Sequence, residues 1–185
     1  MSAKLSNNSH GQATRLRTGR VRISFPHLFE RDQMSGKYSV TLLIDKDDEE
    51  TVKLMKEAVK NAKADGTERL WGGKEPSQLR MIVRDGDKSE HEEEHGCYTI
   101  SAKSNSRIDV YGKGGVLLDD EDDIYGGCYV QAVIEFFPYN NQGKGISCTL
   151  EGLKKVADGE RFGGESYKAG ADDFDDDGDD DDDLI

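Results

Sequence analysis

Cysteine is scarce in this chain, and long apolar runs are missing. Only Cys97, Cys128 and Cys148 occur, with no CxxC pair among them. Their odd number and the lack of an N-terminal signal peptide predict buried thiols in a reducing cytoplasm, and not a disulfide-stapled secreted scaffold. No stretch reaches the roughly 18 apolar residues that a membrane-spanning helix needs, so we expect no contact with a membrane.

Signatures of the common enzyme classes are absent as well. Every Gly-Lys pair lacks a following Ser or Thr, which excludes a Walker phosphate-binding loop, and no nucleophile elbow is present. His91 and His95 match the zinc-protease pattern HExxH, which needs a helix to place both rings on one face. Because no apolar residue lies between Arg84 and Gly96, we interpret this segment as a solvated acidic loop. We therefore expect no catalytic residue, no metal and no cofactor.

The longest β pattern in the chain is a hairpin. Tyr, Val, Ile and Phe fill residues 128–137, which is typical of a half-buried strand, and Pro138 is expected to end it. A loop rich in Asn and Gly follows, and a second β run returns. If the loop centres near Gln142, Phe136 lies opposite Cys148, and one face of the first strand is apolar throughout.

Alternation and helical periodicity predict the flanking elements. Residues 19–25 alternate, which directs Phe25 toward the core and Arg22 away from it. Apolar residues recur at helical spacing over residues 47–64, and Gly66 is expected to stop that helix.

The number and spacing of these elements indicate the fold class. Six or seven strands with short connections and one good helix predict a mainly β (α+β) fold, an OB-type five-stranded antiparallel barrel with insertions. Residues 1–18 lack apolar periodicity and predict a flexible N-terminal arm. The expected domains are this arm, an OB-type domain over residues 19–168, and a C-terminal tail over residues 169–185.

Cationic and aromatic side chains are interleaved along the β body. Such strands suit single-stranded nucleic acid, because the cations neutralise phosphates and unpaired bases stack on the rings. For the rings, burial in the core is the alternative. The candidate DNA-binding residues are the cations Arg20, Arg22, Lys37, Lys74, Lys103 and Lys113 and the rings Trp71, Tyr111, Phe137 and Tyr139.

The last seventeen residues have no Lys or Arg and contain ten aspartates. The whole chain has a net charge of −13, so residues 1–168 have a net charge of only −3. Because this segment cannot bury apolar surface, it predicts a disordered acidic tail that competes with DNA for a cationic groove and recruits partners. A plain solubility tail is the alternative. The residues expected to bind partners are Asp181, Asp182, Asp183, Leu184 and Ile185.

Six short motifs, in order along the chain, resemble a family of bacteriophage single-stranded DNA-binding proteins that was formerly catalogued as a domain of unknown function. They are FPHLFE (25–30), KYSV (37–40), LWGGK (70–74), RDGD (84–87), YGGCY (125–129) and FPYN (137–140). The resemblance covers residues 19–162 and continues in the acidic tail. It implies an OB-type fold and a role in phage DNA replication, recombination or repair, in the cytoplasm of the bacterial host.

We therefore predict a non-catalytic protein that binds single-stranded DNA with little sequence preference. The expected partners are single-stranded DNA and replication or recombination proteins that contact the tail, while weak duplex binding and self-association stay open. Two alternatives belong to other classes. One is an acidic-tailed interaction adaptor with incidental DNA contact, and the other is a metal-dependent nuclease that uses His91 and His95.

Overall fold

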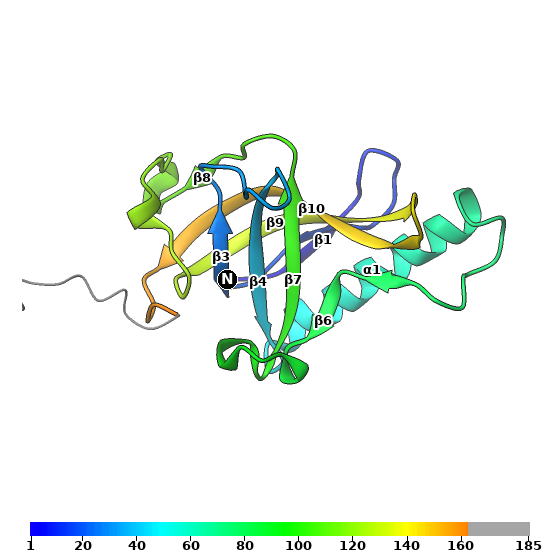
Figure 1. Cartoon of the computed structure of the whole chain (residues 1–185), viewed down its shortest axis with the longest axis horizontal. Helices are drawn as coiled ribbons and strands as arrows, with labels where there is room; N and C mark the ends of the chain where they lie inside the picture. The colour runs from blue at the N-terminus through cyan, green and yellow to red at the C-terminus, as the bar shows by residue number, and fades with distance from the viewer. Residues whose placement is uncertain (163–185) are drawn as a thin grey trace, which may run out of the picture.

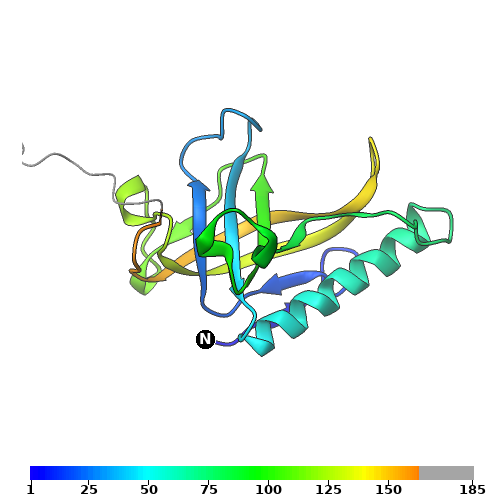
Figure 2. The ribbon, with the colours of Figure 1, turned by 60° about the horizontal axis from the view of Figure 1, so that its bottom comes forward.

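Two long strands, β9 (Tyr129–Asn140) and β10 (Lys144–Ala157), form the hairpin on which the sheet is assembled. Phe136 pairs with Cys148, which confirms the predicted register. Pro138 does not end the first strand, as the sequence suggested, but lies inside β9 opposite Ile146. Proline is tolerated there because no neighbouring segment needs the N–H that it lacks. On that side of β9 the last hydrogen bond is the one that the Phe136 N–H donates to the Thr14 carbonyl. One part of this hairpin belongs to the barrel wall, and the rest projects beyond the barrel (Figures 1 and 2).

Three further strands complete a barrel with this hairpin in the computed structural model, which describes residues 1–162. They are β3 (Val21–His27), β4 (Tyr38–Asp45) and β7 (Cys97–Ser104). The pairing order is β9-β3-β4-β7-β10, and β10 returns to β9. Within this ring only β7 and β10 pair in parallel, through the single pair Thr149 and Lys103, so the ring is partly closed. This arrangement confirms the predicted OB-type barrel, with one parallel pair in place of an entirely antiparallel sheet.

Alternate side chains of the five strands fill the barrel interior. Each of these side chains is at most 1% exposed: Val40, Leu42, Ile44, Ile100, Ala102, Val130, Ala132, Ile134 and Phe136. The side chains between them point outward, and on β4 and β7 these include the short polar side chains Thr41, Thr99 and Ser101. The three cysteines are free thiols.

The N-terminal segment is not the flexible arm that its composition suggested. It forms β1 (Lys4–Ser6) and β2 (Arg15–Arg17), and β2 pairs with β9 at the edge of the sheet. Leu16 is fully buried, which stabilises the fold by about 1.5–3 kcal/mol relative to an exposed leucine. Sequence periodicity missed these strands because each is only three residues long.

The one α-helix among residues 1–162, α1 (Glu49–Arg69), is longer than predicted. It begins after Asp48, whose carboxylate accepts a hydrogen bond from the Thr51 N–H. Gly66 lies inside the helix and does not stop it. A Cβ at that position would stand 2.7 Å from both Pro138 and Trp71, so glycine permits the helix to approach the hairpin closely. Figure 2 shows α1 alongside the projecting part of the hairpin.

Short elements complete the described chain. They are β5 (Arg80–Met81), β6 (Val83–Asp85), β8 (Val110–Tyr111) and the 3-10 turns η1 (Gly86–Lys88), η2 (Glu92–Glu94), η3 (Lys113–Gly115) and η4 (Glu121–Asp123). The predicted acidic tail, residues 169–185, lies outside the described residues, as does the end of the predicted OB domain at residue 168. Among residues 1–162, no helix is long and apolar enough to cross a membrane.

Candidate nucleic-acid interface

A groove of about 820 Å³ lies on the outer face of β4 and β7, and we call it the β4–β7 groove. Its floor consists of hydroxyl side chains, because Thr41 pairs with Ser101 across the two strands and Thr99 lies in the same row of outward positions. Lys103 continues that row at the far end of β7. In chain order β4 and β7 are the second and third strands of the barrel, and in OB barrels these two strands form the face that binds oligonucleotides.

An aromatic pair forms one wall of this groove. The exposed ring of Phe25 meets the ring of His91 edge-on, with centroids 5.4 Å apart and planes at 64°. The Phe25 side chain is 52% exposed. A ring with one free face beside hydroxyl and cationic side chains is suited to stack an unpaired base.

Phe25 was expected to point into the core, and that prediction is wrong. The β3–β4 register slips between Ser24 and His27, so an extra residue enters β3 as a β-bulge. Ser24 still pairs with Thr41, and the alternation breaks after it, so Phe25 is exposed and not buried in the core. The backbone of Phe25 has φ 47°, in the left-handed region that favours glycine.

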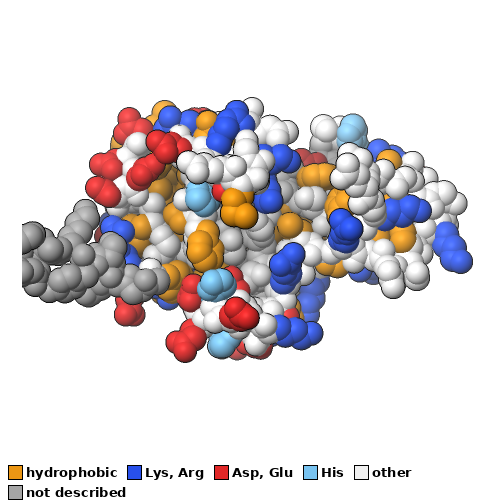
Figure 3. All heavy atoms as spheres, in the orientation of Figure 1, with side chains coloured by type: hydrophobic (Ala, Val, Ile, Leu, Met, Phe, Trp, Pro, Cys, Tyr) orange, Lys and Arg blue, Asp and Glu red, His pale blue; other side chains and the backbone are white. Residues whose placement is uncertain are grey.

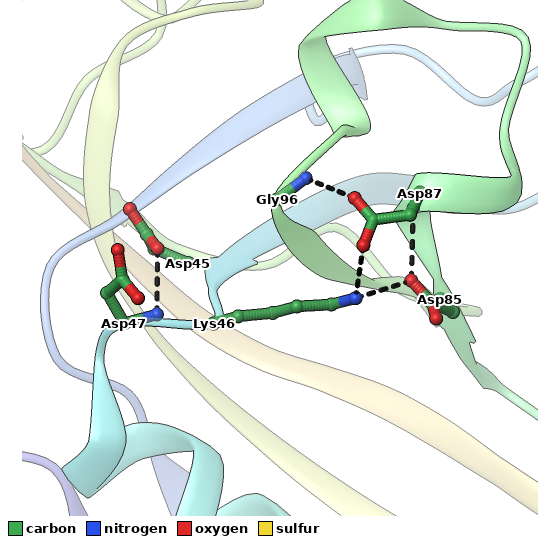
Figure 4. Close-up of polar contacts among 6 residues, drawn as sticks. All are labelled: Asp45, Lys46, Asp47, Asp85, Asp87 and Gly96. Atoms are coloured by element: carbon green, nitrogen blue, oxygen red, sulfur yellow. Dashed lines mark hydrogen bonds and ion pairs between the residues drawn. The ribbon is translucent and has the colours of Figure 1, made fainter.

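The wall that carries His91 is the loop between β6 and β7, and Lys46 at the end of β4 holds it (Figure 4). The Lys46 ammonium donates to Asp85 Oδ1 and to Asp87 Oδ2, both at 2.7 Å. Asp87 also accepts from the Gly96 N–H at 2.6 Å. These contacts tie both ends of the loop to β4. The hydrogen bonds from Lys46 lower the pKa of both carboxyls, and those carboxylates raise the pKa of Lys46.

The same loop folds back tightly on itself at Gly86. A Cβ there would stand 2.0 Å from the Glu94 carbonyl oxygen and 2.6 Å from that of Cys97. Only glycine permits this close approach of three backbone segments. The loop is therefore a compact wall whose position depends on Gly86 and on the Lys46 ion pairs.

Cations border the β4–β7 groove. Arg84 and Lys88 line it from β6 and η1, and Lys103 lines it from β7. Figure 3 shows the face on which β3, β4 and β7 lie in front: Lys and Arg gather over its middle and right, and Asp and Glu at the upper left and the bottom. A polynucleotide on this face would find its cations along β7 and toward the hairpin.

Two of the predicted cations are engaged with aromatic rings elsewhere, on the outer face of β3 and β9. The Arg20 and Arg22 guanidinium groups lie 3.9 and 5.2 Å from the Tyr129 ring centroid, and Arg22 lies 4.2 Å from that of Phe162. We call these four residues the arginine–aromatic stack. Arg22 also donates to the carbonyl oxygens of Gly127, at 3.0 Å, and Glu160, at 2.8 Å. Arg22 thus fastens the end of the described chain to the barrel.

The predicted rings on the hairpin have unequal exposure. Trp71 is only 6% exposed, and its indole N–H donates to the Tyr139 carbonyl at 3.2 Å, so Trp71 belongs to the core between α1 and the hairpin and has no face free for a base. Tyr139 is half-buried beside Gly145. Phe137 is 37% exposed on the outer face of β9.

The remaining predicted cations and rings do not gather at one place. Lys103 alone among the ten predicted DNA-binding residues lines the β4–β7 groove. Lys37 precedes β4, and Lys74 is exposed in the segment after α1. Tyr111 lies on β8, and Lys113 lines a smaller hollow beside Leu118 and Asp123.

Sequence reasoning missed most of the groove residues. Every groove residue except Lys103 was missed, including the ones that could bind a nucleic acid: Phe25, Thr41, Arg84, Lys88, His91, Thr99 and Ser101. The hydroxyls had a usable signal, since they occupy the polar positions of two alternating strands. Phe25 had a weaker signal: Pro26 follows it inside a strand, where proline often accompanies a bulge.

The histidines of the HExxH pattern do not form a metal centre in the described chain. η2 spans only Glu92–Glu94, too short to place His91 and His95 on one helical face. Within residues 1–162, no group of three or more His, Cys, Asp or Glu side chains is arranged to hold a metal ion.

Comparisons with known proteins identify the family and agree with the fold. The family model described as Enterobacter phage Enc34, ssDNA-binding protein, matches residues 14–185. Putative protein p50 of Acyrthosiphon pisum secondary endosymbiont phage 1 is 33% identical over 176 residues, which cover 88% of this chain and 93% of that protein.

Two solved structures extend the comparison. The single-stranded DNA-binding protein of bacteriophage Enc34, in complex with ssDNA, has a TM-score of 0.72 and 28% identity, covering 86% of this chain and 97% of that one. The single-stranded DNA-binding protein gp2.5 of bacteriophage T7 has a TM-score of 0.59 and 16% identity, covering 84% of this chain and 98% of that one. The second likeness concerns the fold alone.

Proposed function

This chain belongs to the family of the ssDNA-binding protein of phage Enc34, and from that premise we propose that it binds single-stranded DNA in the β4–β7 groove. The observation that carries the proposal is the exposed Phe25 ring beside a hydroxyl floor and three cations. The Enc34 protein, whose structure was solved with ssDNA, has the same fold at 28% identity. The groove lies on the face that OB barrels use for oligonucleotides.

Each part of the groove has a distinct task in this proposal. The Phe25 ring stacks on one base, and Arg84, Lys88 and Lys103 neutralise successive phosphates. Thr41, Thr99 and Ser101 supply hydroxyls that donate to phosphate or base oxygens without selecting one base. The protein therefore coats single strands with little sequence preference and without catalysis, in phage DNA replication, recombination or repair.

Not all of the predicted DNA-binding residues keep that role in the proposal. Lys103 has it in the groove, and Lys37, Lys74 and Phe137 are exposed where a longer strand would extend toward the hairpin. Trp71 is withdrawn because it is buried. Arg22 is assigned to fastening the chain.

The test is fluorescence anisotropy of labelled oligo-dT with the wild-type chain and three variants. Phe25→Ala removes the stacking ring and is expected to weaken binding by roughly 5- to 150-fold, the equivalent of 1–3 kcal/mol per stacked base. Phe25→Trp keeps a ring and should retain wild-type affinity. Leu117→Ala is the matched control, because Leu117 is an exposed apolar side chain (60%) outside the groove.

Two results would contradict the proposal. Equal affinities for Phe25→Ala and Leu117→Ala would remove the ring from the interface. Wild-type protein that fails to bind oligo-dT at low salt would refute single-strand binding altogether. Because Phe25 is half exposed, its truncation leaves the core intact, and a melting curve checks this.

A further inference from the structure

A second groove, of about 900 Å³, separates α1 from the strands β5, β6 and β7, and we call it the α1 groove. Its walls are apolar: Met55 and Val59 from the helix face Met81 and Val83 from the strands, with Tyr98 at the bottom. The DNA-binding proposal makes no use of it. An open apolar groove rimmed by charged residues is typical of a binding site.

Lysines border this groove on the helix side. Lys56, Lys60 and Lys63 follow one another at positions i, i+4 and i+7 of α1, so they stand in one row. Lys63 contacts Glu75 at 3.9 Å. Among residues 1–162, neither Lys56 nor Lys60 has a carboxylate within ion-pair distance, and the Lys56 ammonium lies 5.5 Å from the Tyr98 ring centroid.

The two ends of the groove carry opposite charges. Glu68 and Glu75 line it near the C-terminal end of α1, whereas Lys56 and Lys60 are nearer the N-terminal end, next to Met55 and Val59. A ligand suited to the Lys56 end has one or two aliphatic side chains for the apolar walls and carboxylates beside them for the ammonium groups.

The end of this chain has that chemistry. Residues 181–185 are three aspartates followed by Leu184 and Ile185. From Phe162 the chain continues for 23 residues, which reach up to about 76 Å when extended. A compact body of 162 residues has a radius of gyration of about 15 Å, so an extended segment of that length is long enough to cross it.

We propose that residues 181–185 dock in the α1 groove of the same molecule. Leu184 and Ile185 lie against Met55, Val59 and Met81, and the aspartates face Lys56 and Lys60. A tether of this length gives a local concentration of order millimolar, so a weak contact is sufficient for occupancy.

This location differs from the cationic groove that the acidic composition alone suggested. The β4–β7 groove has cations, but hydroxyl and acidic side chains such as Thr41, Asp85 and Glu94 line it beside its aliphatic residues, whereas the α1 groove has facing aliphatic walls. Met81 and Val83 lie in the wall between the two grooves, so DNA affinity would respond to both. The test therefore reads the contact directly and omits DNA.

The experiment is zero-length carbodiimide crosslinking of the full-length chain, with the linked peptides identified by mass spectrometry. We expect amide links from the carboxylates of residues 181–185 to Lys56 and Lys60 in the monomer band. The double variant Leu184→Ser, Ile185→Ser keeps every charge but loses the aliphatic anchor, and should reduce those links about tenfold or more.

A groove variant supplies the second measurement. Val59→Ser should reduce the same links, while Val116→Ser, at an exposed apolar residue outside the groove, should leave them unchanged. If Val59→Ser fails to fold, the tail variant still decides, because its changes lie outside the barrel.

Three outcomes would overturn the proposal: links mainly to Lys88 and Lys103 in the β4–β7 groove, links to Lys56 that persist in the Leu184→Ser, Ile185→Ser variant, or links confined to a dimer band. None of them bears on oligo-dT binding, so the docking proposal and the DNA-binding proposal fail separately.

Discussion

The outer face of β4 and β7 and the outer face of β3 and β9 carry the same kinds of side chain and use them in opposite ways. In the arginine–aromatic stack, Arg20 and Arg22 lie over Tyr129, and Arg22 also donates to two backbone carbonyls. In the β4–β7 groove, Lys103 and the exposed Phe25 ring border a hydroxyl floor.

The difference shows that residue type does not identify a DNA-binding surface by itself. A cation that lies against a ring and donates to carbonyl oxygens is already satisfied and holds the protein together. A cation beside a free ring and a groove has its hydrogen bonds available for a phosphate. The pairing of each side chain, which only the fold supplies, therefore decides between stability and binding.

The strongest way to sharpen this comparison is to remove Arg22. Arg22→Met leaves the carbonyls of Gly127 and Glu160 without a donor, and we expect a loss of about 1–3 kcal/mol in the free energy of unfolding. Oligo-dT affinity of the folded variant should be unchanged. Urea denaturation and anisotropy measure the two effects, and a stable variant with weak binding would mean that the stack contacts DNA.

Removing a groove cation should give the opposite pattern. Lys103→Ala is expected to lower the slope of log affinity against log salt by about 0.7, the contribution of one single-strand phosphate contact. Its unfolding free energy should stay near the wild-type value. Lys53→Ala is the matched control, because this α1 residue loses the same charge away from the groove. Equal slopes for the two variants would mean that Lys103 does not contact a phosphate.

A smaller effect is expected from the ion pairs of Lys46 with Asp85 and Asp87, which we call the loop clamp. Lys46→Met frees the wall that carries His91, and we expect oligo-dT affinity to fall roughly two- to fivefold, as for an exposed ion-pair network. Since Lys46 does not line the groove, the salt slope should not change. A changed slope would show that Lys46 itself contacts phosphate.

The clamp also has a pH signature. The pKa values of Asp85 and Asp87 are lowered in the folded state, so their contribution to stability is full above the unfolded value of about 3.9 and is lost as pH falls through the folded values. The difference in Tm between wild type and Lys46→Met should thus be constant from pH 7 to 5 and shrink below about pH 4. A difference as large at pH 3 as at pH 7 would argue against the ion pairs as its source.

The smallest effect is expected at the edge of the stack. Arg20→Met loses one exposed cation–π contact, which is equivalent to about 0.5–1 kcal/mol of unfolding free energy, and DNA binding should not respond. Thermal melting and anisotropy are again the measurements. A large loss of affinity would return Arg20 to the interface that the sequence suggested.

The sequence predicted those parts of the fold that long, regular patterns specify. The β9–β10 register follows from a loop centred near Gln142 and from two long alternating strands. The OB-type barrel and its one helix follow from the number and spacing of elements. These features depend on local alternation, which a single sequence displays.

What could not be predicted depends on contacts between distant segments. The bulge before Pro26 reverses the phase of β3 and exposes Phe25. Gly66 lies inside the helix and not at its end. Its role is to leave room for Trp71 and Pro138, which a Cβ at this position would meet. Trp71 and Arg22 look available in the sequence and are occupied in the fold. Of the groove residues, Lys103 alone was predicted, because the others are marked only by their position on one face.

The backbone of Phe25 has a consequence for how this protein can be engineered. A residue with a side chain at φ 47° is held in a conformation that costs stability and that glycine adopts freely. Substitution to glycine would therefore be favoured by stability alone. The proposed stacking role requires a ring at this position despite that cost, so efforts to make the protein more heat-resistant should leave position 25 untouched.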